Sequence, residues 1–198
     1  IDIRPQNYIP TRYRVESDWS AASYWYEILA LSGKGNIKLI GLNENSLQGD
    51  RAVADIFENL GVETVFYENE VELSVSDQIR KVSDKFRYDF TNVPDLAQTV
   101  VVTCCLMKKP FHFSGLQSLK IKETNRVAAL MCELRKLGYV LIEPQEGELV
   151  WDGAKGEADE IAAIDTYEDH RMAMAFAPIS IVQPIIIRNP EVVSKSYP

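Results

Sequence analysis

The chain has 198 residues, 46% of them hydrophobic, and a formal net charge of −8. This length and composition predict a folded core of one or two domains, and no apolar run is long enough to span a membrane. The acidic balance argues against a nucleic-acid groove, although a few basic residues can still converge into a local anion site.

The rare residue types narrow the chemistry further. The two histidines and three cysteines lack the spacing of metal ligands, so we expect no metal site. Cys104, Cys105 and Cys132 are expected to be buried free thiols in a reducing compartment. The start, IDIRPQNYIP, lacks the basic and apolar regions of a signal peptide, so we expect a cytoplasmic protein. Both ends, at Ile1 and Pro198, are expected to be cuts in a longer sequence.

An internal repeat organises the chain. Three segments each place an acidic residue before a long apolar run: VESDWSAASYWYEILALSGKG, FTNVPDLAQTVVVTCCLMKK and TYEDHRMAMAFAPISIV. The acidic residues Asp18, Asp95 and Asp169 lie 77 and 74 residues apart. An aspartate in this position is a good helix N-cap, because its carboxylate accepts the free amide hydrogens of the first turn. The apolar character on nearly all sides predicts that these three helices are buried.

Short strands follow the buried helices, in NIKLIGL, FHFSGL and PIIIRNP. Gly41, Gly115 and Asn189 end these strands at steps of 74 residues, and both residue types tolerate a left-handed turn. Amphipathic helices come next in the first two copies, in DRAVADIFENLG and NRVAALMCELRKLG, because apolar residues recur there at helical spacing. Two strands follow each, ETVFYE with EVELSV and YVLIE with ELVWDG. RYRVES, KFRYDF and DEIAAID are expected to be strands that lead into the buried helices.

The repeated unit is therefore strand, buried helix, strand, amphipathic helix, strand, strand. It predicts an α/β fold of repeated β-α-β-α-β-β units, with mixed sheets around buried helices. The third copy stops at Pro198, where its second helix is expected to begin. Pro178 lies inside the third buried helix and is expected to kink it.

Basic residues recur at the predicted helix starts, where unpaired amides and the helix dipole attract anions. Lys122 and Arg126 lie four residues apart, so on a helix they repel each other unless an anion lies between them. His170 and Arg171 lie in a first helical turn, where cations need a compensating anion. Lys195 marks the next expected helix start. If the repeats pack around an axis, these groups converge on one polyanionic ligand, which the residues alone do not name.

Several of these residues also suit purely structural roles. Ser20 and its small neighbours allow either close approach of a ligand to the backbone or tight helix packing, and Tyr24 adds a hydroxyl. Asp95 suits a helix cap or, if a substrate hydroxyl reached it, a base. Glu123 between two cations suits a solvated helix start or a group that moves a proton.

Six segments in order carry a resemblance to a known family: VESDWSAASYW, NSLQGDRAVADIFENLG, VPDLAQT, SLKIKETNRVAALMCELRKLG, TYEDHRMAMAF and SKSYP. They resemble the C-terminal half of 3-phosphoshikimate 1-carboxyvinyltransferase, or EPSP synthase, and cover nearly the whole chain. The resemblance implies two lobes of three such units each, with the active site between the lobes. It assigns residues 1–48 to the last unit of the N-terminal lobe. Residues 49–198 are assigned to the C-terminal lobe, truncated in its final unit.

That family transfers the enolpyruvyl group of phosphoenolpyruvate to the 5-hydroxyl of shikimate 3-phosphate, by addition and then elimination of phosphate, in aromatic amino acid biosynthesis. The resemblance implies that Asp95 is the base at the hydroxyl and that Glu123 exchanges a proton with the methylene carbon. The residues implied to bind phosphoenolpyruvate are Arg126, His170, Arg171 and Lys195. Those implied to bind shikimate 3-phosphate are Lys122, Asp95, Ser20, Tyr24 and Ser118. No metal or cofactor is implied, and the full-length protein is expected to be a monomer.

Some positions depart from the family pattern. Ala21 stands where many members have a serine that contacts shikimate 3-phosphate, and Ser118 stands where an amide is common. Asn125 replaces a commoner aspartate and Glu168 a common asparagine. The family's other half supplies further lysine, arginine and glycine-rich contacts, so the chain alone is expected to be inactive. A noncatalytic lobe or binding module, and an enolpyruvyl transferase with another acceptor, remain as alternatives.

Overall fold

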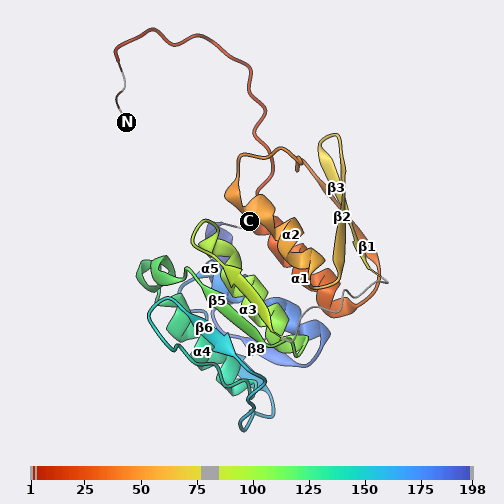
Figure 1. Ribbon diagram of the computed structural model, residues 1–198, viewed down its shortest axis with the longest axis vertical. Coiled ribbons are helices and arrows are strands. Elements are labelled where there is room, and N and C mark those ends of the chain that lie inside the picture. Colours follow the sequence, from red (N-terminus) through yellow and green to blue (C-terminus); the bar gives the residue numbers. More distant parts are fainter. Residues whose placement is uncertain (1, 3, 77–84, 197–198) are drawn as a thin grey trace.

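Three buried helices form the centre of the computed structural model, which describes residues 2, 4–76 and 85–196 (Figure 1). They are α1 (Trp19–Ser32), α3 (Ala97–Leu106) and α5 (His170–Phe176). Helix α1 packs on α3, and α3 packs on α5. The expected α/β fold with one buried helix in each repeat is confirmed.

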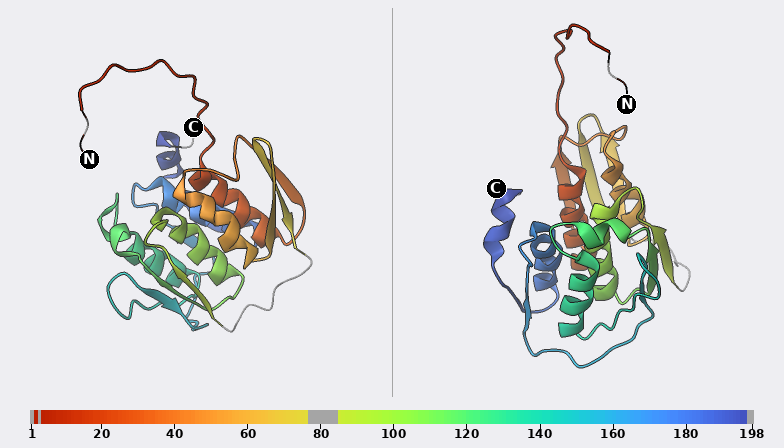
Figure 2. Two further views of the ribbon diagram at one scale, coloured as in Figure 1. Left: turned by 45° about the horizontal axis from the view of Figure 1, so that its top comes forward. Right: turned by 90° about the vertical axis from the view of Figure 1, so that its left-hand side faces the viewer.

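The first sheet is antiparallel and lies against α1 and α2 (Figure 2). Its central strand is β3 (Glu70–Val75), which pairs with β1 (Asn36–Ile40) on one side and β2 (Val62–Tyr67) on the other. The division expected at residue 48 does not interrupt this body, because β1 precedes residue 48 and its partner β3 follows it. That division stays a prediction about the longer protein.

The other two sheets contain the parallel pairs. In the second sheet, β5 (Phe111–Ser114) pairs in parallel with β4 (Phe86–Asp89) and antiparallel with β6 (Leu149–Trp151). In the third, β7 (Ala162–Ile164) pairs in parallel with β8 (Ile185–Ile187). Parallel neighbours need a long crossover connection, and the buried helices α3 and α5 supply it.

The two amphipathic helices are α2 (Val53–Glu58) and α4 (Arg126–Lys136), as expected. Among the described residues, five 3₁₀ turns connect the remaining elements: η1 (Gly49–Ala52), η2 (Pro94–Leu96), η3 (Gln117–Ile121), η4 (Ala177–Ile181) and η5 (Pro190–Lys195). Pro178 interrupts the third buried helix as expected, since α5 ends at Phe176 and η4 continues the chain.

Local backbone signals in the sequence are borne out at most positions. Asp18 and Asp169 cap α1 and α5 by accepting hydrogen bonds from Ser20 N at 2.8 Å and Arg171 N at 2.9 Å. The three strand-ending residues have positive φ angles, 89° at Gly41, 75° at Gly115 and 51° at Asn189.

Two expected strands are absent from the described structure. Residues 12–17 form no strand; their exposed side chains, including Tyr13 and Val15, bury no apolar face against a partner. The segment YVLIE makes only isolated bridges, Tyr139 with Lys155 and Ile142 with Val150. Its partner strand β6 has only three residues, so a longer ladder cannot form there.

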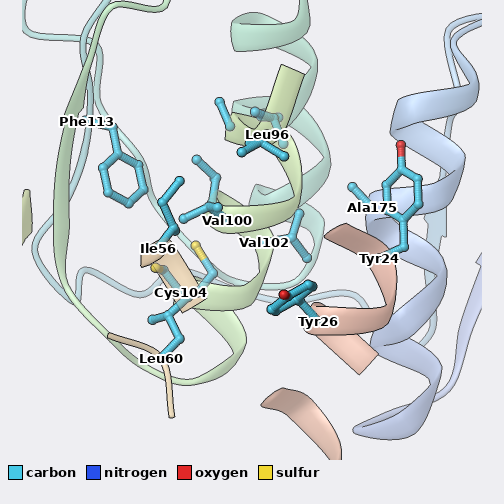
Figure 3. Close-up of a cluster of buried hydrophobic side chains, with 14 of the residues drawn as sticks. Tyr24, Tyr26, Ile56, Leu60, Leu96, Val100, Val102, Cys104, Phe113 and Ala175 are labelled. Carbon is cyan, nitrogen blue, oxygen red and sulfur yellow. The ribbon is translucent and has the colours of Figure 1, made fainter. Parts of the chain in front are cut away.

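One continuous apolar core joins α1, α2, α3, α5 and β5, and Figure 3 shows part of it. Cys104 and Cys105 are buried free thiols within it, as expected, but Cys132 is exposed on α4. Cys132 lies outside the core because it falls on the solvent side of an amphipathic helix. Within the described ranges, no helix has both the length and the apolar character needed to cross a membrane.

Glu27 of α1 is a carboxyl group inside this core. It is fully buried, and neither of its side-chain oxygens has a hydrogen-bond partner within residues 2, 4–76 and 85–196. An ionised carboxylate there loses its hydration, so burial raises the pKa of Glu27 well above its usual value, against the opposing effect of the nearby Thr103 hydroxyl. At a pH between the pKa of Glu27 in the unfolded chain and its pKa in the folded chain, the folded chain therefore keeps a proton that the unfolded chain has released.

This proton makes stability depend on pH. A group whose pKa is higher in the folded state stabilises the fold fully below its unfolded pKa, and that stability is lost as pH rises toward the folded pKa. We expect Glu27→Gln, which keeps the shape without titrating, to raise the free energy of unfolding, with a gain that grows from about pH 4 to pH 8. Urea denaturation across this range measures the gain. A gain that is constant with pH, or equal to that of exposed Glu44→Gln, would contradict the assignment.

Candidate active site

Arg126, the first residue of α4, is the centre of a charged cluster, and its side chain is only 2% exposed. Its Nε and Nη2 donate to the two carboxylate oxygens of Asp169 at 2.6 and 3.3 Å. Nη1 donates to Asp95 Oδ1 at 3.0 Å, and Nη2 donates to Glu123 Oε2 at 2.7 Å. A buried charge is costly unless it is paired and hydrogen-bonded, and these three carboxylates together meet that requirement.

Asp95 is the second centre of the cluster, because three cations contact its carboxylate. Lys122 Nζ lies 3.5 Å and Arg126 Nη1 3.0 Å from Oδ1, and Arg171 Nη2 lies 3.2 Å from Oδ2. The expectation that Asp95 caps its helix is wrong: no side-chain cap bond is made at the start of η2 or α3, and the carboxylate accepts from side chains of other elements. The anion expected between Lys122 and Arg126 is here the chain's own Asp95.

Lys122 and Arg126 do not share a helix. Lys122 follows η3 with an extended backbone, ψ −154°, and α4 begins only at Arg126, after the N-cap residue Asn125. The repulsion expected for a helical i, i+4 pair of cations therefore does not arise. The break lets Lys122 reach Asp95 from the η3 side while Arg126 reaches it from α4.

The start of α5 brings His170 and Arg171 to the same cluster. The anions that compensate this pair are Asp169, which caps the helix, and Asp95, which contacts Arg171. Burial and the charge of Arg171 both lower the pKa of His170. Burial raises the pKa of nearby Tyr24 to about 12, against the opposing effect of Arg171, so Tyr24 stays a neutral hydroxyl.

A small hollow of about 30 Å³ lies where α1 meets α5. Ser20, Tyr24, His170 and Arg171 are among the residues that line it. The Ser20 hydroxyl donates to the carboxylate of Asp50, whose pKa is raised by burial. The structure thus brings the expected residues of α1 beside those of α5, but the hollow has room for water rather than for a substrate.

Two expected site residues lie apart from these contacts. Ser118 is exposed in η3, and none of the cluster's hydrogen bonds among the described residues involves it. Lys195 ends η5, a turn that packs against α5, but its side chain lies outside the part of the chain that the structure describes. The roles of Ser118 and Lys195 stay predictions.

Two acidic residues belong to the site although the sequence did not single them out for it. Asp169 was expected only as a cap, yet it also holds Arg126 through two hydrogen bonds. Asp50 accepts from Ser20 and lies close enough to Arg171 for its charge to affect the pKa of Asp50. Asp169 occupies the same repeat position as Asp95. This equivalence in the sequence could have indicated that Asp169 also belongs to the site.

The balance of charge limits what this cluster binds on its own. Three cations, Lys122, Arg126 and Arg171, face four carboxyl groups, those of Asp50, Asp95, Glu123 and Asp169. In the described ranges, no three or more His, Cys, Asp or Glu side chains gather as metal ligands. The arrangement suits proton transfer beside arginines, with further cations needed before a polyanion is held firmly.

The repeated α/β body, and the arginines, lysine and carboxylates gathered near its helix starts, agree with the family that the sequence motifs resemble. The sequence profile of EPSP synthase (3-phosphoshikimate 1-carboxyvinyltransferase) matches residues 1–198. The chain therefore belongs to the EPSP synthase family.

Curated relatives carry the same name. The chain is 52% identical over 197 residues to 3-phosphoshikimate 1-carboxyvinyltransferase of Bacteroides fragilis strain YCH46, covering 99% of this chain and 47% of that protein. It is 36% identical over 190 residues to that of Idiomarina loihiensis, covering 96% and 42%. The chain spans about half the length of the curated relatives it matches.

A solved structure supports the fold. EPSP synthase from Acinetobacter baumannii superposes with a TM-score of 0.70 at 19% identity, covering 93% of this chain and 44% of that one. At this identity the likeness shows the fold alone.

The Arg126–Asp169 pair gives a stability prediction. Asp169→Asn keeps the shape and the cap to Arg171 but removes the charge that faces buried Arg126. We expect it to lower the free energy of unfolding by up to about 3–5 kcal/mol, because buried Arg126 loses its fully buried carboxylate and keeps only the partly exposed Asp95 and Glu123. Asp55→Asn, which removes the exposed partner of the partly buried Arg51, should cost less than about 1 kcal/mol. Equal losses in urea denaturation of the two variants would show that burial of the pair does not matter.

Proposed function

We propose that this chain is part of an enzyme that transfers the enolpyruvyl group of phosphoenolpyruvate to the 5-hydroxyl of shikimate 3-phosphate and releases phosphate. Family membership supports the proposal. The observation that carries it is the position of Asp95, whose carboxylate contacts Lys122, Arg126 and Arg171. Glu123 contacts the guanidinium of Arg126 as well. Two candidate proton-transfer groups thereby lie beside cations suited to an anionic substrate.

The guanidinium of Arg126 would keep its contacts with Asp169 when a substrate binds and would exchange its contacts with Asp95 and Glu123. Asp169, fully buried, contacts Nε and Nη2 and sets the orientation of the guanidinium plane. Asp95 and Glu123, 27% and 51% exposed, contact the terminal nitrogens that a substrate carboxylate would take. Binding of phosphoenolpyruvate would then exchange two of the chain's own carboxylate contacts for those of the substrate, with Arg171 and His170 alongside.

This exchange frees the two carboxylates for proton transfer. Asp95 would take the proton of the attacking 5-hydroxyl, while Glu123 would give a proton to the methylene carbon, forming a tetrahedral intermediate. In the elimination, Glu123 would take a proton back from the methyl group while the bond to the phosphate oxygen breaks. The leaving phosphate would take up the proton that Asp95 had accepted, which returns both carboxyl groups to their starting states. The neighbouring cations would stabilise the negative charge of the bound phosphates and the leaving group. Lys195 is proposed to lie near that phosphate.

The acceptor would bind on the α1 side of the cluster. Ser20 and Tyr24 line the hollow beside Arg171, and Lys122 contacts Asp95 from η3. Ala21, also on the lining, offers no hydroxyl where many family members have a serine, so Ser20 would have to take that contact. Ser118 is proposed as a further contact from η3.

The chain by itself is proposed to bind either substrate weakly. Both substrates are anionic, and four carboxyl groups already face the three cations of the cluster. Cations from the half that the relatives have in addition would have to complete the site. We propose that the complete protein acts in the cytoplasm as a monomer without a cofactor, with residues 1–48 in one lobe and 49–198 in the other.

Phosphate release tests the function directly. A protein that joins this chain to the half present in its relatives should release phosphate from phosphoenolpyruvate when shikimate 3-phosphate is supplied. It should not do so with UDP-N-acetylglucosamine, and the 198-residue chain alone should be inactive with either acceptor. Activity only with the UDP-sugar would establish the alternative acceptor. No release with either acceptor would support a noncatalytic binding module.

Variants of the same complete protein test the two proton-transfer roles. We expect Asp95→Ala and Glu123→Ala each to lower kcat by about 10²–10⁴-fold, the usual contribution of a positioned acid or base. Asp55→Ala, which removes an exposed carboxylate from α2, is the matched control and should leave kcat unchanged. Near-normal turnover of either site variant would exclude the role assigned to that residue.

A further inference from the structure

Glu133 of α4 is a fully buried carboxylate at the centre of a second polar network. Its Oε2 accepts from Lys136 Nζ at 2.6 Å and from the backbone N of Asp165 at 3.0 Å. Its Oε1 accepts from the Tyr167 hydroxyl at 2.6 Å. Burial and the hydrogen bond to Glu133 raise the pKa of Tyr167, so its hydroxyl keeps the proton that it donates.

The segment held by this network has an unusual backbone. Tyr167 and Glu168 are consecutive non-glycine residues with positive φ angles, 54° and 57°. Each costs on the order of 1 kcal/mol, so the segment needs contacts that hold it in this shape. Lys136 Nζ adds two of them, donating to Ala163 O at 2.9 Å and to Asp165 Oδ2 at 2.8 Å.

Helix α4 holds this segment at both ends. Glu133 and Arg126 lie seven residues apart, about two helical turns, so they project from the same face of α4. Glu133 contacts Asp165 and Tyr167 before and within the strained pair, whereas Arg126 contacts Asp169 directly after it. The next residues are His170 and Arg171, and Asp169 caps their helix. The strained pair is thereby held between the hydrogen bonds of Glu133 on one side and the buried Arg126–Asp169 ion pair on the other, and both come from α4.

We propose that Glu133, acting through Tyr167, is a positioning residue for the phosphoenolpyruvate-binding arginines Arg126 and Arg171. The network sets where Asp169 lies; Asp169 then fixes the plane of Arg126 and the start of α5, from which Arg171 projects. This inference rests on the proposed function, because it concerns the geometry of that same site. It assigns Glu133 and Tyr167 no contact with substrate.

A positioning role makes the kinetic effect selective. Displacement of the 165–169 segment shifts both arginines and therefore weakens binding of phosphoenolpyruvate. The α1 residues proposed for the acceptor, Ser20 and Tyr24, are not held by this network, and the acceptor residue Asp95 meets it only through the two arginines. A contact that only stabilises the fold would lower the unfolding temperature and leave both KM values unchanged.

Tyr167→Phe is the mild test, because it removes one hydrogen bond to Glu133 and leaves the ring and the Lys136 contacts. In the complete protein we expect KM for phosphoenolpyruvate to rise about tenfold, while KM for shikimate 3-phosphate stays within about twofold. Tyr26→Phe is the matched control: it removes a buried tyrosine hydroxyl whose partner, Thr64 Oγ1 at 2.9 Å, lies on the first sheet. It should change neither KM.

Glu133→Gln and Glu133→Asp test the same positioning role at the carboxylate itself. Gln keeps the length but not the charge that Lys136 and Tyr167 face, so KM for phosphoenolpyruvate should rise further than in Tyr167→Phe. Asp keeps the charge and should recover part of the loss. Equal rises of both KM values, or loss of thermal stability with unchanged KM for phosphoenolpyruvate in Tyr167→Phe, would overturn the inference.

The two proposals fail in distinguishable ways. A wild-type complete protein that releases no phosphate with shikimate 3-phosphate refutes the proposed function, and the positioning role falls with it. A wild-type protein that turns over normally, with Tyr167→Phe kinetically identical to Tyr26→Phe, refutes the positioning role and leaves the function intact.

Discussion

Arg126 remains buried only because Asp95, Glu123 and Asp169 surround its guanidinium. These contacts tie the start of α4 to the start of α3 and to the start of α5, so one side chain joins the second and third copies of the repeat. The same contacts determine the chemistry available at the cluster, since Asp95 also contacts Lys122 and Arg171, and Asp169 also accepts from the backbone N of Arg171. Structure and candidate function therefore depend on the same ion pairs.

The repeat explains why these groups meet. Each copy sends a buried helix inward, and packing α1 on α3 and α3 on α5 brings their starts together. The acidic residues at the three starts then divide their roles. Asp18 and Asp169 accept backbone amide hydrogens of their own helices, whereas Asp95, preceded by Pro94 in a 3₁₀ turn, turns its carboxylate to side chains of other elements. One sequence position thus gives two structural caps and one carboxylate available to a ligand.

The sequence was sufficient where the determinant is local. The local signals that held are the helix starts capped by Asp18 and Asp169, the left-handed residues Gly41, Gly115 and Asn189, and the interruption at Pro178. The ion pairs were not predictable in detail, since Asp95 is 31 residues from Arg126 and 76 from Arg171. The strands expected at RYRVES and YVLIE failed because a strand also needs a partner edge and a face to bury, which no short segment specifies.

The described part of the third copy is smaller than the first two copies, and this affects how readily it opens locally. Helix α5 has 7 residues, whereas α1 has 14 and α3 has 10, and the third sheet pairs only three residues of β7 with three of β8. Few hydrogen bonds of its own hold the described part of this copy closed, so its sub-global unfolding free energy rests on its packing against α1 and α3 and on its ties to α4. When a ligand bridges the third copy, which contains Arg171, to the second copy, we expect the amide hydrogens of the third copy to be those whose exchange slows most.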